Sequence, residues 1–89
     1  MNPSEVITWV CRNAIPSVDP LETIRSRTGE DSWNCSRLKT VMARKMHDLG
    51  MRTIDISRHL EQTWNATNHQ IARSEKLKSN PKYQHLFDL

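Results

Sequence analysis

The sequence predicts an all-α domain of about five or six helices. Among its 89 residues only two are glycine and four are proline, and β-branched residues seldom alternate with polar ones. Helices joined by short turns therefore fit the chain better than strands do. Pairs of a capping residue and a proline also recur, as they do where helices begin. A chain of this length suits one domain with a limited core, so we expect residues 1–89 to form a single unit.

Two helices are predicted in the N-terminal third of the chain. Asn2–Pro3 precedes apolar residues at helical spacing and predicts a helix over residues 3–14. Asp19–Pro20 repeats the pattern and predicts a short helix that ends at about residue 27.

The clearest amphipathic segment is "SRLKTVMARKMHDLG", which is predicted to form the central helix of the core. The stretch before it, "EDSWNCS", reads as an irregular connection. We expect Ser36 to cap the central helix and Gly50 to end it. The apolar stripe expected in the core consists of Leu38, Val41, Met42, Met46 and Leu49.

Two further helices joined by a short turn are predicted after Gly50. "TIDISRHLEQ" places Ile56 and Leu60 four residues apart, with the small Ser57 beside them, so that a second helix can cross closely. The second helix is predicted at about residues 65–79, and Thr63 and Asn65 are its capping candidates. Its expected buried contacts are Trp64, Ile71 and Leu77. The C-terminal tail, 80–89, is expected to dock through Tyr83, Leu86 and Phe87.

A helix, a short turn and a second helix with a polar, basic outer face are typical of a helix-turn-helix, here at about residues 53–79. Glu61 stands where this turn usually has a glycine. The second helix of the motif lies in the major groove, where amides pair with adenine, arginine with guanine, and threonine methyl groups with thymine. The residues predicted to contact bases are Asn65, Thr67, Asn68, His69 and Gln70. Those predicted to contact phosphates or the minor groove include Arg37, Arg52, Arg73 and Lys76.

Basic residues gather in the C-terminal half of the chain. From Arg37 to Lys82 ten basic residues stand against four acidic ones, a balance of +6, whereas the rest has three against six, a balance of −3. This asymmetry favours an anionic partner, most often a nucleic acid. The alternative is a solvated basic face, with the polar run at the start of the second helix serving only to cap it.

The order of the predicted elements resembles the C-terminal DNA-binding domain of the replication initiator DnaA, in the Trp-repressor-like group of helix-turn-helix folds. "VDPLETIRSR" is similar to the family's short helix and basic loop, and "SRLKTVMARKM" to the amphipathic helix that follows. "TIDISRHL" resembles the first helix of the family's DNA-binding motif, and "IARSEKL" with "SNPKY" resembles the end of its recognition helix. The resemblance implies that Arg25 and Arg27 contact the DNA backbone or the minor groove.

The family's signature before the recognition helix, Gly-Arg-Asp-His-Thr-Thr-Val, is absent. The corresponding stretch is "QTWNATNHQI", in which Thr67, Asn68 and His69 are the candidates for the family's base-reading positions. The family's standard origin box is therefore not implied as the target. The Gly-rich phosphate loop of the family's neighbouring ATPase is missing too. We expect a free-standing DNA-binding domain, as in small regulators of phages and mobile elements.

The function predicted from the sequence is sequence-specific binding of double-stranded DNA, regulating transcription or replication in the cytoplasm, at the nucleoid. The alternative is a protein-interaction module on a helix-turn-helix scaffold, such as a phage accessory protein that binds a host factor. Its anchors would be aromatic side chains, if exposed, namely Trp9, Trp33 and Tyr83. Family members typically bind as monomers, whereas most helix-turn-helix regulators are dimers, so a homodimer remains open.

Other functional classes find little support in the sequence. No apolar run is long enough to span a membrane, and the N-terminus lacks the pattern of a secretory signal. Cys11 and Cys35 are too few for a disulfide scaffold and read as core or boundary residues in a reducing cytosol. The histidines make no metal spacing with the cysteines, and no nucleophile has a discernible base. We expect no metal, cofactor, small-molecule substrate or enzymatic activity.

Overall fold

The chain folds into a helical bundle in the computed structural model, which describes residues 2–14, 19–25 and 30–87. The side chains of residues 30–35 lie outside this description. The described residues form helices and no strand. The helices are α1 (Pro3–Ala14), α2 (Pro20–Arg25), α3 (Glu30–Asp48), α4 (Thr53–His59), α5 (Trp64–Lys78), α6 (Pro81–Gln84) and the 3₁₀-helix η1 (His85–Phe87).

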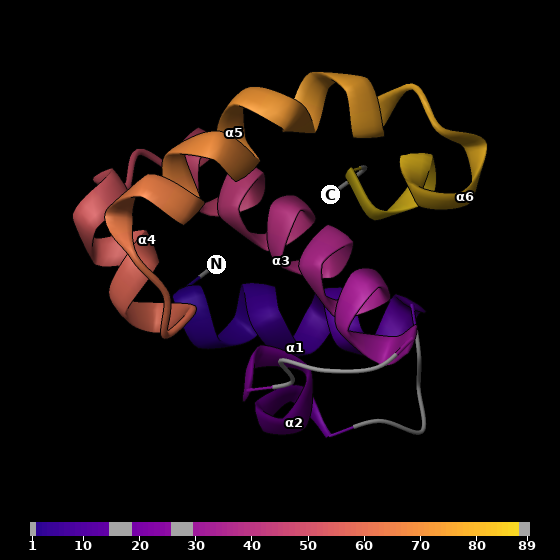
Figure 1. Cartoon of the computed structure of the whole chain (residues 1–89), viewed down its shortest axis with the longest axis horizontal. Coiled ribbons are helices and arrows are strands. Elements are labelled where there is room, and N and C mark those ends of the chain that lie inside the picture. Colours follow the sequence, from indigo (N-terminus) through magenta and orange to yellow (C-terminus); the bar gives the residue numbers. More distant parts are fainter. Residues whose placement is uncertain (1, 15–18, 26–29, 88–89) are drawn as a thin grey trace.

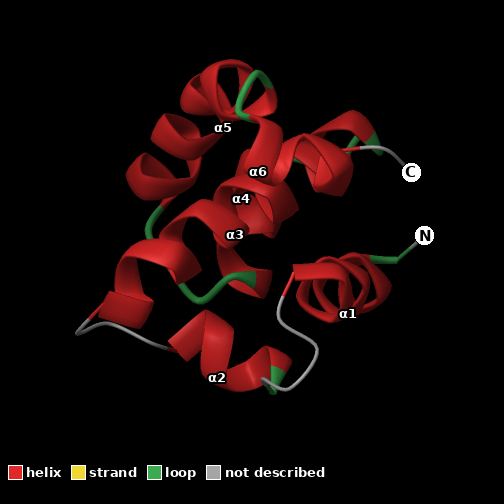
Figure 2. Ribbon diagram, turned by 90° about the vertical axis from the view of Figure 1, so that its right-hand side faces the viewer, coloured by secondary structure: helices red, strands yellow, loops and turns green. Residues whose placement is uncertain are grey.

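Helix α3 is the central element of the molecule (Figure 1). It packs most extensively against α5 and α1, which lie on opposite sides of it (Figures 1 and 2). The shorter helices α2 and α4 also contact α3, and α4 packs against the first part of α5. After α5 the chain turns back, so that η1 reaches both α1 and α3. The molecule measures 29 × 24 × 23 Å.

The hydrophobic core is supplied chiefly by α1, α3 and α4. Its fully buried apolar side chains include Val6, Val10, Leu38, Val41, Met42, Met46, Ile56 and Leu60. Each such side chain stabilises the fold by about 1.5–3 kcal/mol relative to an exposed one. Helix α5 differs, because its two fully buried residues are the hydroxyl-bearing Thr67 and Ser74, whereas Ile71 and Leu77 are half-buried. Polar contacts therefore have a large part in holding α5.

The predicted starts of the first two helices are confirmed together with their caps. Helix α1 spans residues 3–14, and Asn2 Oδ1 accepts a hydrogen bond from the backbone N of Glu5 at 2.8 Å. Asp19 Oδ1 accepts one from the backbone N of Leu21 at 2.9 Å, at the start of α2. Helix α2 is described as far as Arg25, and the end predicted at about residue 27 lies outside the described residues.

The start predicted for the central helix is wrong. Helix α3 begins at Glu30, so the stretch "EDSWNCS" is helical, and Ser36 lies inside the helix rather than at its cap. The backbone carbonyl of Ser36 accepts a hydrogen bond from Thr40 Oγ1 at 3.0 Å. Serine and asparagine cost only about half a kcal/mol in a helix interior, and each residue added to a formed helix gains a hydrogen bond.

Two apolar residues predicted to be buried are half exposed. Leu49 follows the last residue of α3 and is 48% exposed, beside Gly50, whose φ of 90° turns the chain. Trp64 is the first residue of α5 and is 49% exposed. Both lie at helix ends, where the apolar stripe of a helix extends beyond the neighbouring helices that could cover it. In contrast, Tyr83 and Leu86 of the tail are buried and Phe87 packs against the core, as predicted.

Candidate functional site

Helices α4 and α5 are joined by four residues, Leu60 to Thr63. Leu60 is fully buried and fixes the end of α4 in the core. Glu61 has a φ of 52°, which places its backbone in the left-handed region that favours glycine. Thr63 then takes an extended conformation, and its hydroxyl oxygen accepts a hydrogen bond from the backbone N of Ala66 at 3.1 Å. Thr63, one of the two capping residues predicted from the sequence, is therefore the N-cap of α5.

A polar network behind the turn joins the linker to α5. Gln62 Nε2 donates to Thr67 Oγ1 at 3.0 Å and also to Gln70 Oε1. Gln70 Nε2 donates back to Gln62 Oε1 at 3.2 Å. The Thr67 hydroxyl donates to the backbone carbonyl of Thr63 at 3.0 Å. These bonds satisfy the buried Thr67 and fix how α5 is rotated about its axis.

Arg44 of α3 binds two residues in the middle of α5, Ser74 and Glu75. Its Nη1 donates to Ser74 Oγ at 3.1 Å and lies 2.7 Å from Glu75 Oε1, and its Nε lies 3.1 Å from Asp48 Oδ1. Burial lowers the pKa of Arg44, but the hydrogen bonds and charges of Glu75 and Asp48 outweigh this, so the pKa is raised above its ordinary value. The guanidinium therefore stays charged throughout the pH range in which proteins fold.

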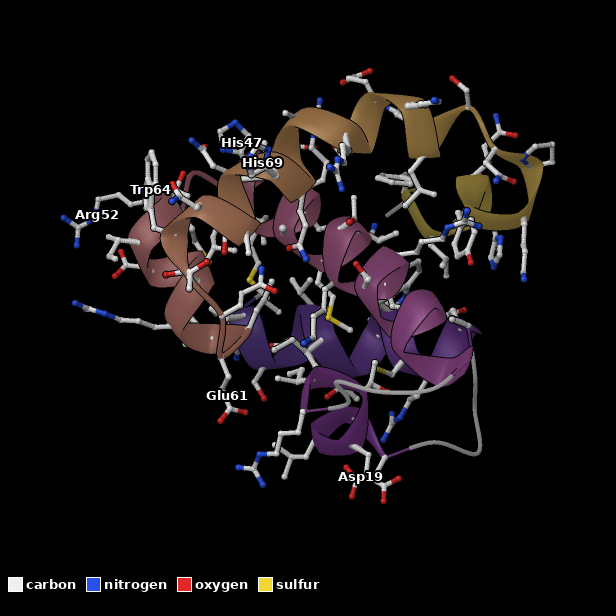
Figure 3. All side chains as sticks on the ribbon, viewed as in Figure 1. Asp19, His47, Arg52, Glu61, Trp64 and His69 are labelled. Atoms are coloured by element: carbon white, nitrogen blue, oxygen red, sulfur yellow. The ribbon has the colours of Figure 1, made fainter. Side chains whose placement is uncertain are left out.

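The outer face of α5, defined here as Asn65, Asn68, His69, Ala72, Arg73 and Lys76, is exposed. Three of the residues predicted to contact bases, Asn65, Asn68 and His69, come together at the N-terminal end of this face (Figure 3 labels His69). Glu75 is the acidic residue of α5, and its carboxylate is engaged by Arg44. The outer face is therefore polar and basic.

Two of the predicted base contacts do not lie on this face. Thr67 is fully buried, and Gln70 is half-buried with its amide bonded to Gln62. A helix has 3.6 residues per turn, so a run of consecutive residues cannot all face outward. The run of polar residues at 65–70 does not by itself distinguish the outer side of α5 from the side that contacts α3 and α4. The structure assigns Thr67 and Gln70 to that inner side.

The basic residues predicted to contact phosphates are found in several environments. Arg25 Nε lies 3.3 Å from Glu61 Oε2, which links the end of α2 to the turn after α4. Arg52 Nε lies 3.0 Å from Asp55 Oδ2 and is otherwise exposed (Figure 3). Arg73 and Lys76 are exposed on the outer face of α5. Arg27 lies outside the described residues.

Arg37 lies on α3, yet it shares a cleft with Arg73 and Lys76 of α5. The cleft has a volume of about 440 Å³, and its lining comes from α3, α5 and the start of α6: Ser36, Arg37, Thr40, Arg73, Lys76, Leu77 and Asn80. The sequence predicts each of these three cations as a phosphate or minor-groove contact, but it does not predict that they line one cleft. No signal in the sequence relates residue 37 to residue 73, because the packing of α5 across α3 brings them together.

The aromatic residues predicted to anchor a protein partner lie in different environments. Tyr83 is only 3% exposed, and the guanidinium of Arg37 lies over its ring at 5.5 Å. Trp9 is half-buried, and Lys45 Nζ lies 4.5 Å from the centre of a Trp9 ring. Trp33 lies among the residues whose side chains are outside the description. Among the described aromatic side chains the most exposed is Trp64, which the sequence predicts to be buried.

Comparisons with protein-family models, with curated proteins and with solved structures gave no match. Within the described part of the chain, no three side chains of the metal-binding types gather where they could hold an ion. None of the described helices is both long enough and apolar enough to span a membrane.

Proposed function

We propose that the protein binds double-stranded DNA in a sequence-specific manner through a helix-turn-helix formed by α4 and α5. In this proposal it regulates transcription or replication by binding, without catalysing a reaction, and associates with the nucleoid. The observation that carries the proposal is the outer face of α5. Two amides and an imidazole lie together at one end of this face, and two cations follow along the same helix.

The chemistry of that face suits the major groove. Asn65 and Asn68 can each present a carbonyl and an NH₂ group to the N6 and N7 edge of adenine, and His69 can donate to or accept from a base. Ala72 leaves room for the helix to approach the base edges closely. Arg73 and Lys76 would bind the phosphate backbone, so that affinity would fall with salt. The buried bonds of Thr67 and Gln70 support this reading, because they fix which face of α5 is presented.

The resemblance to the C-terminal domain of DnaA remains part of the proposal. The succession of a short α2, a long α3, α4 and α5 supports it, and Arg25 lies in the last turn of α2. The ion pair between Arg25 and Glu61 places this arginine close to the turn of the proposed motif. Arg25 would reach a phosphate of the same duplex by exchanging its carboxylate partner.

A protein-binding function is the second candidate, and one observation favours it. Three large apolar side chains near the α3–α4 turn and the start of α5 are strongly exposed: Leu49 (48%), Ile54 (40%) and Trp64 (49%). Exposed apolar groups of this kind often mark contacts with another protein. A partner or a second copy of the chain would bind there without using the outer face of α5.

Selection of bound duplexes from a random pool, at low and at moderate salt, separates the two functions. DNA binding predicts an enriched motif at both concentrations, with less material retained at the higher salt. The variant Asn68→Ala should change the enriched motif. The control Asn13→Ala, at an exposed position of α1, should leave the motif as it is in the wild type. Retention of no duplex even at low salt would reject the proposal and favour the protein-binding function.

A further inference from the structure

The cleft between α3 and α5 is a basic site that the proposed base contacts do not use. Arg37 lies on its α3 wall and Arg73 and Lys76 on its α5 wall, and none of the described residues that line it carries a carboxylate. Arg73 and Lys76 are three residues apart on one helix, a spacing at which like charges repel. Within the described parts of the chain neither of them forms an ion pair, in contrast to Arg25 and Arg44. The cleft thus concentrates positive charge.

The helix dipole accounts for only part of this charge. Lys76 lies in the last turn of α5, where a cation suits the helix dipole. Arg37 and Arg73 lie well inside α3 and α5, so the dipole does not explain them. Arg37 lies over the Tyr83 ring, and this contact helps to position the guanidinium at the cleft.

The polar groups of the cleft suit an anion with several oxygen atoms. Asn80 Oδ1 accepts from the backbone N of Lys82 at 3.0 Å, so the NH₂ group of Asn80 is left as a donor. Ser36 adds an exposed hydroxyl. Two guanidinium groups, one ammonium group and these neutral donors stand around one opening. Guanidinium groups bind phosphate oxygens in pairs, and a tetrahedral phosphate offers oxygens to donors on both walls.

We propose that this cleft is a binding site for a single phosphate group, held jointly by Arg37, Arg73 and Lys76. For its source the inference rests on the proposed function: the phosphate is one of the duplex backbone, beside the groove that α5 enters. A contact shared by α3 and α5 would then fix how far along the groove the recognition helix sits. A free phosphate compound is the other source of the same chemistry.

The first arm of the test uses inorganic phosphate and no DNA. Backbone amide signals are followed by nuclear magnetic resonance during titration with phosphate, at an ionic strength held constant with sodium chloride. Saturable shifts are expected around Thr40, Arg73 and Lys76, and they should be lost in Arg73→Gln and kept in Arg12→Gln, which removes a cation on α1. Absence of saturable shifts, or shifts retained in Arg73→Gln, would overturn the site whether or not the protein binds DNA.

The second arm measures duplex affinity against salt for Arg37→Gln, Arg73→Gln, Lys76→Gln and the triple variant. If the three cations hold one phosphate, the triple variant lowers the slope of log affinity against log salt by about 0.9 in total. Three separate phosphates would give an additive loss of about 2.7 and would overturn the shared site. Unchanged slopes, with phosphate binding intact in the first arm, would reject the duplex as the source. Failure of the wild type to bind duplex rejects the proposed function alone.

Discussion

At the scale of single residues, Glu61 carries the least favourable backbone conformation. Among the described residues it is the one non-glycine with a positive φ, 52°. Its carboxylate pairs with Arg25, but the two side chains are 46% and 65% exposed, so the pair adds little stability. Glu61 therefore stands at a position where glycine would be tolerated better, and the turn forms because Leu60 and Thr63 are fixed on either side of it.

Replacing Glu61 by glycine and by alanine separates backbone strain from the ion pair. Both variants lose the carboxylate, but only glycine adopts the left-handed conformation without steric cost. We expect Glu61→Gly to be more stable to urea than Glu61→Ala by about 1 kcal/mol. Equal stability of the two variants would mean that the turn is unstrained at this position.

Thr67 is predicted to act in folding and not in base contact. In Thr67→Val the hydroxyl is lost, and the donor of Gln62 and the carbonyl of Thr63 lose a partner inside the protein. The free energy of unfolding should fall by about 1–3 kcal/mol. Asn68→Ala, a change at the exposed neighbouring position, should alter it by no more than about 0.5 kcal/mol. Similar losses in both variants would contradict the assignment of Thr67 to the inner side.

At the scale of elements, α5 is the helix whose attachment the sequence predicted least well. Its existence and approximate bounds, 65–79 against Trp64–Lys78, were predicted from capping and turn residues. Its rotation was not, because its apolar residues are few and do not define a face. Thr67 and Ser74 make up much of the inner side, and no periodicity rule identifies a buried hydroxyl. Trp64 was predicted to be a buried contact of α5, but it is the first residue of the helix and is half exposed.

Arg44 is expected to be the principal polar link between α3 and the middle of α5. Arg44→Gln removes its charged contacts with Ser74 and Glu75, and the unfolding free energy should fall by about 1 kcal/mol. Hydrogen exchange of the α5 amides should also become faster, because the helix is less firmly held.

Arg58→Gln provides the matched control for this substitution. Arg58 Nη1 lies 3.9 Å from Asp55 Oδ1 and its side chain is 75% exposed, so its loss should change stability by less than about 0.5 kcal/mol. If the two variants unfolded alike and exchanged alike, Arg44 would not be the link between the helices.

At the scale of the whole molecule, the order of the helices and the core were largely predictable. Apolar periodicity identified the buried stripes of α1 and α3 and the pair Ile56 and Leu60, because these residues face the centre of the bundle. The basic cleft could not be predicted, since Arg37 and Arg73 meet only through the crossing of α3 and α5. The excess of basic residues between Arg37 and Lys82 is a property of composition, and its arrangement into an outer face and a cleft is a property of the fold.

The central claim is that the outer face of α5 reads DNA sequence. The most direct measurement compares the affinity for a selected duplex with that for a scrambled duplex of the same length, at one salt concentration, in the wild type and in Asn68→Ala. We predict that the wild type prefers the selected duplex and that Asn68→Ala loses about 1–3 kcal/mol of this preference, while its affinity for the scrambled duplex is unchanged. Equal affinity of the wild type for both duplexes would contradict the claim.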